Sequence, residues 1–233
     1  MQIRVGTSGY AYKPWKGPFY PEDLKDAAML SYYADRLPTV EINNTFYRMP
    51  KREVVERWAA DVPESFRFVL KASQRITHRK RLRDADEELD YFCRTASALG
   101  DRLGPLLFQL PPYVKADPER LREFLGKLPS GHRAAIEFRH ESWLVDEVYG
   151  VLREAGAAHC LADTDDSEAE PELVATADWG YLRLRRADYG DADLAAWAQR
   201  LRRQPWSEAY VFFKHEDAGR GPELARRLLD ILG

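Results

Sequence analysis

Hydrophobic and polar residues alternate along this chain in two kinds of block. Short apolar runs, such as residues 66–71 and 105–110, have the length of buried strands, and the second run stops at two consecutive prolines. Longer segments, such as residues 85–99, carry apolar residues every three or four positions, as amphipathic helices do. The pattern predicts strands and helices in alternation.

Eight strands are predicted, at residues 3–9 (with a small-residue turn), 40–43, 66–71, 105–110, 134–139, 158–163, 180–185 and 209–214. Helices are predicted at residues 21–37, 53–60, 85–99, 118–128, 145–155, 194–202 and 222–232. Strictly alternating elements favour a parallel sheet with right-handed crossovers. Eight units indicate a TIM-type (β/α)8 barrel in a single domain, residues 1–233, with a doubly wound open sheet as the rival fold.

Strand residues in such a barrel alternate between the lumen and the helix layer, and catalytic groups lie at the C-terminal strand ends. We assign the face with large apolar residues to the helices. This test turns Tyr181, Arg183 and Arg185 inward, and it places Asp163 inward with Leu161 and His159. The side chains predicted to ring the mouth are Glu41, Asn43, Lys71, Gln109, Glu137, Arg139, Asp163, Arg183 and, if His215 does not take its place, Lys214.

Carboxylates and cations interleave in this ring. Buried charges are costly unless they are paired, so the ring either satisfies itself as an ion-pair network or offers its charges to a ligand. In the second case Lys71, Arg139 and Arg183 would bind a small anion such as a phosphate or a carboxylate. Glu41 and Glu137 are then candidates for proton transfer, and Lys71 is a third catalytic candidate, as a nucleophile or an anion anchor.

The remaining candidates would contact a substrate rather than react with it. Asn43 and Gln109 would orient the ligand, and Asp163 and Lys214 would line the mouth. Tyr47 belongs to the loop through which a substrate would enter. Tyr10 and Trp15 form either an aromatic wall over the pocket or a packed loop.

Composition and short motifs exclude several classes of function. A net charge of -3 gives no global attraction to nucleic acid or membrane, and no apolar run approaches the roughly 20 residues that span a bilayer. We therefore expect a cytoplasmic protein with no membrane partner. Cys93 and Cys160 are too few for a disulfide framework and are expected to be inert.

Cofactor and metal motifs are not found in the sequence. The glycine pair near the N-terminus matches neither a P-loop nor a dinucleotide fingerprint, so we expect no cofactor. A metal would require convergence of Glu41, Glu137, Asp163 and His215. Since Lys71 and Arg139 would oppose a cation there, we expect no metal site.

One dense basic run, residues 75–83, follows the third strand. The acidic residues after it can neutralise it as a solvated face. The alternative is a steering patch for a phosphorylated substrate or for single-stranded nucleic acid, with Tyr10 and Trp15 as stacking surfaces.

Several motifs at these strand ends match a known family. They are Gly6-Thr7-Ser8-Gly9-Tyr10 with Trp15, Val40-Glu41-Ile42-Asn43, Thr45-Phe46-Tyr47-Arg48, Gln109-Leu110-Pro111-Pro112 and Glu137-Phe138-Arg139-His140. The chain resembles the YecE-like family, the domain of unknown function 72. The resemblance implies a TIM-type barrel and no established activity. The chain departs from the family at Arg185-Arg186 and at Lys214-His215, where relatives carry less charge.

These observations favour a barrel enzyme, a hydrolase or lyase-type acid/base catalyst, acting on a small phosphate- or sugar-bearing anion. The alternative is a non-catalytic or nucleic-acid-associated module that uses the same mouth and residues 75–83.

Overall fold

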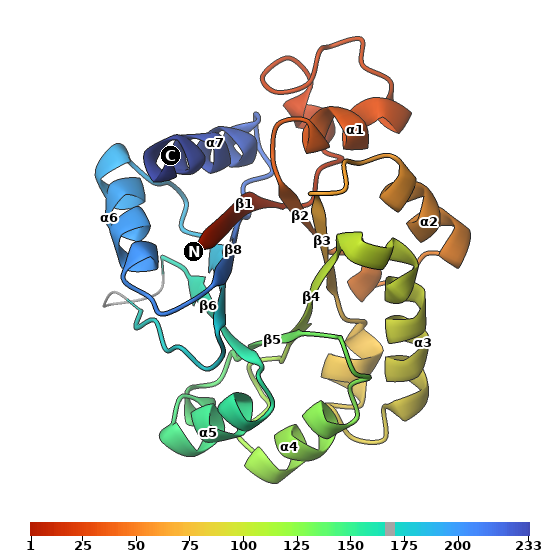
Figure 1. The fold of residues 1–233 in the computed structure, drawn as a ribbon, viewed down its shortest axis with the longest axis vertical. Helices are drawn as coiled ribbons and strands as arrows, with labels where there is room; N and C mark the ends of the chain where they lie inside the picture. Colours follow the sequence, from red (N-terminus) through yellow and green to blue (C-terminus); the bar gives the residue numbers. More distant parts are fainter. Residues whose placement is uncertain (166–170) are drawn as a thin grey trace.

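The computed structural model describes residues 1–165 and 171–233, and its strands form a closed parallel barrel in chain order, the predicted TIM-type fold (Figure 1). Six residue pairs, from Gln2 with Glu208 to Thr7 with Phe213, join the first strand to the last. The strands are β1 Gln2–Ser8, β2 Thr39–Ile42, β3 Arg67–Lys71, β4 Leu103–Gln109, β5 Ala134–Glu137, β6 Ala158–Asp163, β7 Trp179–Leu184 and β8 Glu208–Phe213.

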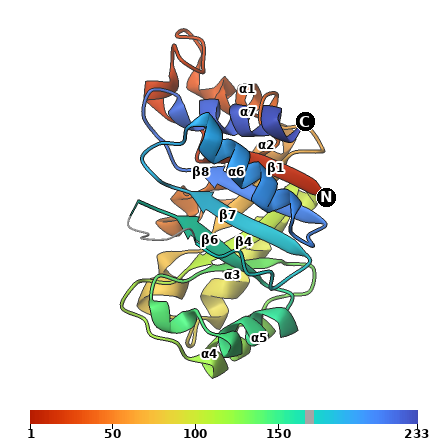
Figure 2. The ribbon, with the colours of Figure 1, turned by 90° about the vertical axis from the view of Figure 1, so that its left-hand side faces the viewer.

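Helices surround the strands as an outer ring (Figure 1). Within the described residues they are α1 Met29–Ala34, α2 Arg52–Ala60, α3 Asp86–Ala96, α4 Pro118–Gly126, α5 Asp146–Glu154, α6 Asp191–Arg202 and α7 Arg220–Leu232. Each buries one stripe; in α7 the stripe is Leu224, Ala225 and Leu228, at the three-to-four spacing of a single helix face. Figure 2 shows the strands crossing the barrel at a slant, as closure requires.

The helix predicted at residues 21–37 is much shorter. It is the six-residue α1, preceded by a 3-10 turn at Asp26–Ala28. The rings of Phe19 and Tyr20 pack edge-on against Tyr32, with centroids 5.8 and 5.5 Å away. This aromatic cluster fixes the preceding loop, so tertiary packing overrides the local helical pattern. No helix of the described residues is long and apolar enough to cross a membrane.

The core has two layers. Val69, Leu107, Tyr181 and Phe212 belong to the cluster that fills the lumen. A larger cluster lies between the strands and the helices, and it includes Phe68, Phe108, Ile136 and Leu182. The alternation confirms the predicted faces of β3, β4, β5 and β7. Cys93 and Cys160 are both buried and form no disulfide.

Gly6 sets the approach of the first two strands. A Cβ atom at Gly6 would lie 2.0 Å from the carbonyl oxygen of Thr39, so any larger residue would force β1 and β2 apart. The resulting register pairs Ser8 with Glu41. A glycine in the barrel wall therefore helps to position the first group of the site.

Candidate functional site

Arg183 joins two carboxylates from different parts of the barrel. Its Nη2 donates to Oε1 of Glu41 at 2.8 Å, and its Nη1 donates to Oε2 of Glu137 at 2.7 Å. All three side chains are buried. Strands β2, β5 and β7 are not neighbours in the sheet, so the guanidinium group bridges the lumen near the C-terminal strand ends.

Glu41 accepts four hydrogen bonds. Besides Arg183, its donors are Ser8 Oγ at 2.7 Å, Asn43 Nδ2 at 3.1 Å and Tyr181 OH at 2.5 Å. Burial alone would raise the pKa of Glu41, but the charge of Arg183 and the hydrogen bonds from Tyr181 and Ser8 outweigh it, so the pKa is lowered. Glu41 is therefore an ionised, fully satisfied carboxylate.

Glu137 is held by three arginines. Arg139 Nε donates to Oε1 at 2.5 Å, and Arg185 Nη1 lies 3.8 Å from the same oxygen. Burial opposes ionisation, but Arg183 and Arg139 dominate and lower the pKa of Glu137 to about 2. Neither carboxylate of the ring carries a proton at neutral pH.

Lys71 differs from its neighbours. Its Nζ lies 4.3 Å from the centroid of the Phe46 ring, and within the described residues it has neither a hydrogen bond nor an ion pair. Burial, and then the charge of Arg183, lower the pKa of Lys71 to about 8, although Glu41 and Glu137 act in the opposite direction. Its ammonium group can therefore lose and regain a proton near neutral pH.

The ring has a surplus of positive charge. Arg139, Arg183 and Arg185 pair with the two carboxylates Glu41 and Glu137, and Lys71 adds a fourth positive charge. Arg183 Nε and the Nε and Nη1 atoms of Arg185 are buried without a hydrogen-bond partner. Buried donors of this kind are uncommon in proteins, and here they belong to two arginines of a ring with surplus positive charge.

Asp163 does not join this ring, and its predicted inward orientation is wrong. Its face of β6 is the outer one, because Leu161 belongs to the outer cluster while Cys160 lies in the lumen. Asp163 accepts a hydrogen bond from Tyr189 OH at 2.8 Å and pairs with Arg186 Nε at 3.1 Å. The size of Leu161 already indicates an outward face for Asp163, so the inward prediction went against the rule that large apolar residues face the helices.

Gln109 and Lys214 lie at the edge of the mouth. Gln109 ends β4 directly beside Glu137 in the strand pairing and is partly exposed. Lys214 follows β8 and is exposed, and burial together with Arg185 lowers its pKa. His215 is turned away, with Nε2 2.7 Å from the carbonyl oxygen of Arg186. The choice between Lys214 and His215 thus falls to Lys214.

The N-terminal aromatic residues form a packed loop. Trp15 is fully buried, and its Nε1 donates to the carbonyl oxygen of Glu216 at 2.9 Å. Tyr10 packs against Tyr33 and lines a small cavity of about 110 Å³ that Asn43 also reaches. Tyr47, in contrast, is 73% exposed. Trp15 therefore supports the loop, whereas Tyr10 faces a cavity, together with Tyr12.

The sequence interpretation left three members of the site unassigned: Ser8, Tyr181 and Arg185. The alternation rule had turned Tyr181 and Arg185 inward. Ser8 shares its face of β1 with Gly6, and two-residue periodicity would have found it. Their partners come from other strands, however, and no local pattern specifies those contacts.

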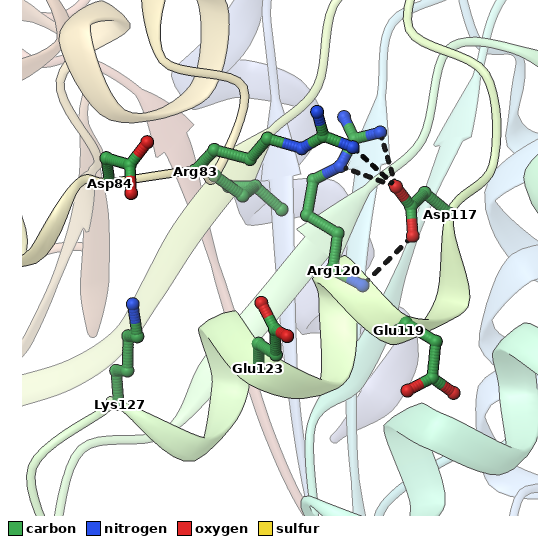
Figure 3. A pocket seen from close by; sticks show the side chains of 8 residues that line it. Arg83, Asp84, Asp117, Glu119, Arg120, Glu123 and Lys127 are labelled. Atoms are coloured by element: carbon green, nitrogen blue, oxygen red, sulfur yellow. Dashed lines mark hydrogen bonds and ion pairs between the residues drawn. The ribbon is translucent and has the colours of Figure 1, made fainter.

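Other pockets lie outside the ring. One of about 370 Å³, between the loop before α3 and helix α4, is lined mainly by charged residues (Figure 3). Arg83 and Arg120 both turn to Asp117 there, at 3.1 and 2.6 Å, so these charges are already paired. In residues 1–165 and 171–233 no three His, Cys, Asp or Glu side chains are grouped to hold a metal.

Comparison with known proteins gives the family. The model of the protein family of unknown function DUF72 matches residues 4–233. The chain belongs to the DUF72 family. Curated relatives of this DUF72 protein include UPF0759 protein YecE of Escherichia coli O157:H7, 28% identical over 87% of this chain and 85% of the relative. UPF0759 protein YunF of Bacillus subtilis (strain 168) is 23% identical over 99% of this chain and 94% of the relative.

Solved DUF72 structures share the barrel. The crystal structure of a DUF72 family protein from Thermotoga maritima MSB8 superposes with a TM-score of 0.81 at 28% identity, covering 100% of this chain and 99% of the other. One from Enterococcus faecalis V583 has the same TM-score of 0.81 at 19% identity, over 99% and 95% of the two chains, which shows the fold alone. These names state no activity, so a function has to be argued from the site.

Proposed function

We propose that this DUF72 protein is an enzyme that binds a small phosphate- or carboxylate-bearing substrate at the C-terminal mouth and transfers a proton through Lys71. The supporting observation is the surplus of cations, with buried donors left unbonded on Arg183 and Arg185. Arg139, Arg185 and the free Nε of Arg183 would bind the anion. Asn43 and Gln109 would orient the anion from the edge of the mouth.

The assignment of roles follows from protonation. A general acid or base works best when its pKa is close to the operating pH. Lys71, with a pKa of about 8, meets this condition, whereas the pKa of Glu137 is lowered to about 2. Glu41 and Glu137 therefore serve mainly to fix Arg183, and Glu137 remains available as a weak base. Proton abstraction or elimination, rather than hydrolysis through a protonated carboxyl group, fits these charges.

Competitive amine labelling across a pH series, read by mass spectrometry, tests the proposal. Lys71 is expected to reach half-maximal reactivity near pH 8. Inorganic phosphate should protect Lys71 and raise this midpoint, because a bound anion stabilises the ammonium form. Exposed Lys51, which lies on the same side of the barrel beyond β2, is the internal control and should be unprotected.

A screen of phosphate esters and small carboxylates completes the test. Turnover should be lost in Lys71→Met while binding of the same compound weakens in Arg139→Gln. Unchanged labelling of Lys71 at high phosphate concentration, together with calorimetry showing no anion binding, would refute the proposal.

A further inference from the structure

Exposed tyrosines flank the basic run at the mouth. Tyr47, beyond β2, is 73% exposed, and Tyr113, beyond β4, is 62% exposed. Arg75, Arg79 and Arg81, beyond β3, lie between them in the chain, and all three are exposed. We call these five residues the tyrosine–arginine rim.

Contacts connect the rim across three loops. Tyr47 packs edge-on against Phe46 with centroids 5.1 Å apart, and Phe46 packs against His78 at 4.9 Å. The OH group of Tyr113 lies 3.5 Å from the carbonyl oxygen of His78, and the guanidinium of Arg81 is 5.7 Å from the Tyr113 ring. Since Phe46 also covers Lys71, the rim is continuous with the charged mouth.

Acidic residues that follow the three arginines pair with other cations, although Lys80 first and then the charge of Arg75 lower the pKa of Glu88. Within the described residues Arg75, Arg79 and Arg81 form no ion pair. Glu88 pairs with Lys80 at 2.8 Å, and Asp86 pairs with Lys127 at 3.0 Å. Arg83 is excluded from the rim, because it turns to Asp117 (Figure 3).

The backbone that carries these arginines is strained. Residues Arg75–Arg79 form a π-helix, and Arg81, Leu82 and Asp84 have φ values of 53°, 69° and 47°. Left-handed conformations are costly for residues other than glycine, and both they and π-helical turns are concentrated at functional sites. Arg75, Arg79 and Arg81 are exposed on this segment.

We propose that the tyrosine–arginine rim binds single-stranded nucleic acid. Bases stack on Tyr113 and Tyr47, and the phosphates between them contact Arg75, Arg79 and Arg81. Aromatic platforms beside unpaired cations are the combination that single strands require, because every base has a stacking face and every linkage has a charge. Trp15 and Tyr10, the stacking partners expected from the sequence, are packed into the N-terminal loop and take no part.

Fluorescence anisotropy with a labelled oligo(dT) of about 12 nucleotides, a length within the range of such sites, tests the proposal. Contacts to three phosphates predict a salt slope of about -2, so affinity should fall by roughly 20-fold between about 50 and 200 mM salt. Tyr113→Ala should weaken binding about fivefold or more. Arg79→Glu with Arg81→Glu should weaken it more strongly and flatten the salt slope.

Matched substitutions elsewhere separate this site from general electrostatics. Tyr91, 50% exposed on α3, is the tyrosine control, and Arg203→Glu with Arg226→Glu is the charge control. Both controls should bind the oligonucleotide as the wild type does. Inorganic polyphosphate should compete poorly, since it has no bases to stack.

Three results would overturn the inference: no binding at the lower salt concentration, equal losses in the rim and control variants, or equal binding of polyphosphate. The rim does not depend on the proposed proton transfer. Lys71→Met removes the latter and leaves the five rim residues intact, so the two proposals fail in different experiments.

Discussion

Both ends of the barrel contain buried ion pairs. Among the described residues, however, buried arginine nitrogens without a hydrogen-bond partner occur at only one end. At the N-terminal end, Arg4 donates to Glu208 at 2.8 Å, to the carbonyl oxygen of Ser65 at 2.9 Å and to Gln2 Oε1 at 3.0 Å. Arg133 donates to the second oxygen of Glu208 at 2.9 Å and to Tyr210 OH at 3.1 Å. This cluster closes the bottom of the lumen.

The C-terminal cluster uses the same residue types with a different result. Arg183 satisfies two carboxylates but leaves its own Nε unbonded, and Arg185 leaves two nitrogens unbonded. Lys71 has no hydrogen-bond or ion-pair partner among the described residues, only the face of the Phe46 ring. Complete pairing at the N-terminal end stabilises the fold, whereas incomplete pairing at the C-terminal end leaves donors that can bind a ligand. This agrees with TIM barrels in general, where the C-terminal face carries the active site and the N-terminal face contributes stability.

The largest expected effect comes from Arg183→Met. It removes the one cation paired with Glu41 among the described residues, while Glu137 keeps Arg139. Removing one partner of a buried pair typically costs about 3–5 kcal/mol. Urea unfolding followed by fluorescence and circular dichroism should show this loss. Arg4→Met is the matched change at the other end and should cost only about 1–3 kcal/mol, because Glu208 keeps Arg133. Equal losses at the two ends would contradict the view that Arg183 alone joins the carboxylates.

Acid should act on the C-terminal cluster through Glu137. Its folded pKa of about 2 is below the ordinary 4.5, so its stabilising contribution is present above about pH 4.5 and is lost as the pH falls towards 2. The unfolding free energy of the wild type should therefore fall by about 2–3 kcal/mol more than that of Glu137→Gln over this range. Parallel pH profiles of the two proteins would show that Glu137 has an ordinary pKa.

Lys71→Met, unlike Arg183→Met, should raise the free energy of unfolding. The folded pKa of Lys71 is lowered to about 8, so below pH 8 its charge destabilises the fold, and wild-type stability should rise as the pH increases from about 8 to 10.5. Removing the charge should raise the unfolding free energy by about 1–3 kcal/mol at pH 7. Arg133→Met, at the N-terminal end, should lower it.

Phosphate provides the control for Lys71→Met. Phosphate should stabilise the wild type and reduce the difference in unfolding free energy between the wild type and Lys71→Met, since the bound anion pairs with the ammonium group. A destabilised Lys71→Met in the absence of anions would mean that Lys71 is already satisfied, and the contrast between the two ends would disappear.

Strand order and most faces could be predicted from the sequence, because large apolar residues such as Phe68, Phe108 and Leu182 recur at every second position of their strands. The prediction failed at β6, where Asp163 was turned inward although Leu161, on the same face, packs in the outer cluster. The lumen side of β6 carries Ala158 and Cys160. Small residues are needed there because Tyr181 and neighbouring rings of β7 and β8 occupy the lumen. Side-chain size in one strand depends on the strands beside it, and a single segment does not contain that information.

The same limit applies to the charges. The sequence placed Glu41, Glu137 and Arg183 at one end of the barrel, and the structure joins them. Glu41 is fully hydrogen-bonded because Ser8 and Tyr181, from distant parts of the chain, donate to it. Arg185 receives no such partners, and two of its nitrogens stay without a hydrogen bond. Long-range contacts decide which charge is structural and which is available to a ligand.

The smallest effect is expected from Asp163→Asn, which tests whether the anion site extends as far as Arg186. Asp163 lies outside the lumen with Tyr189 and Arg186, so anion affinity measured by calorimetry should change less than about twofold, as expected for a screened charge outside the site. Arg139→Gln, at the mouth, should weaken the same binding about tenfold, the usual cost of a lost charge-assisted hydrogen bond. A comparable loss in Asp163→Asn would place Arg186 within the anion site, because Arg186 is the cation that Asp163 holds in place.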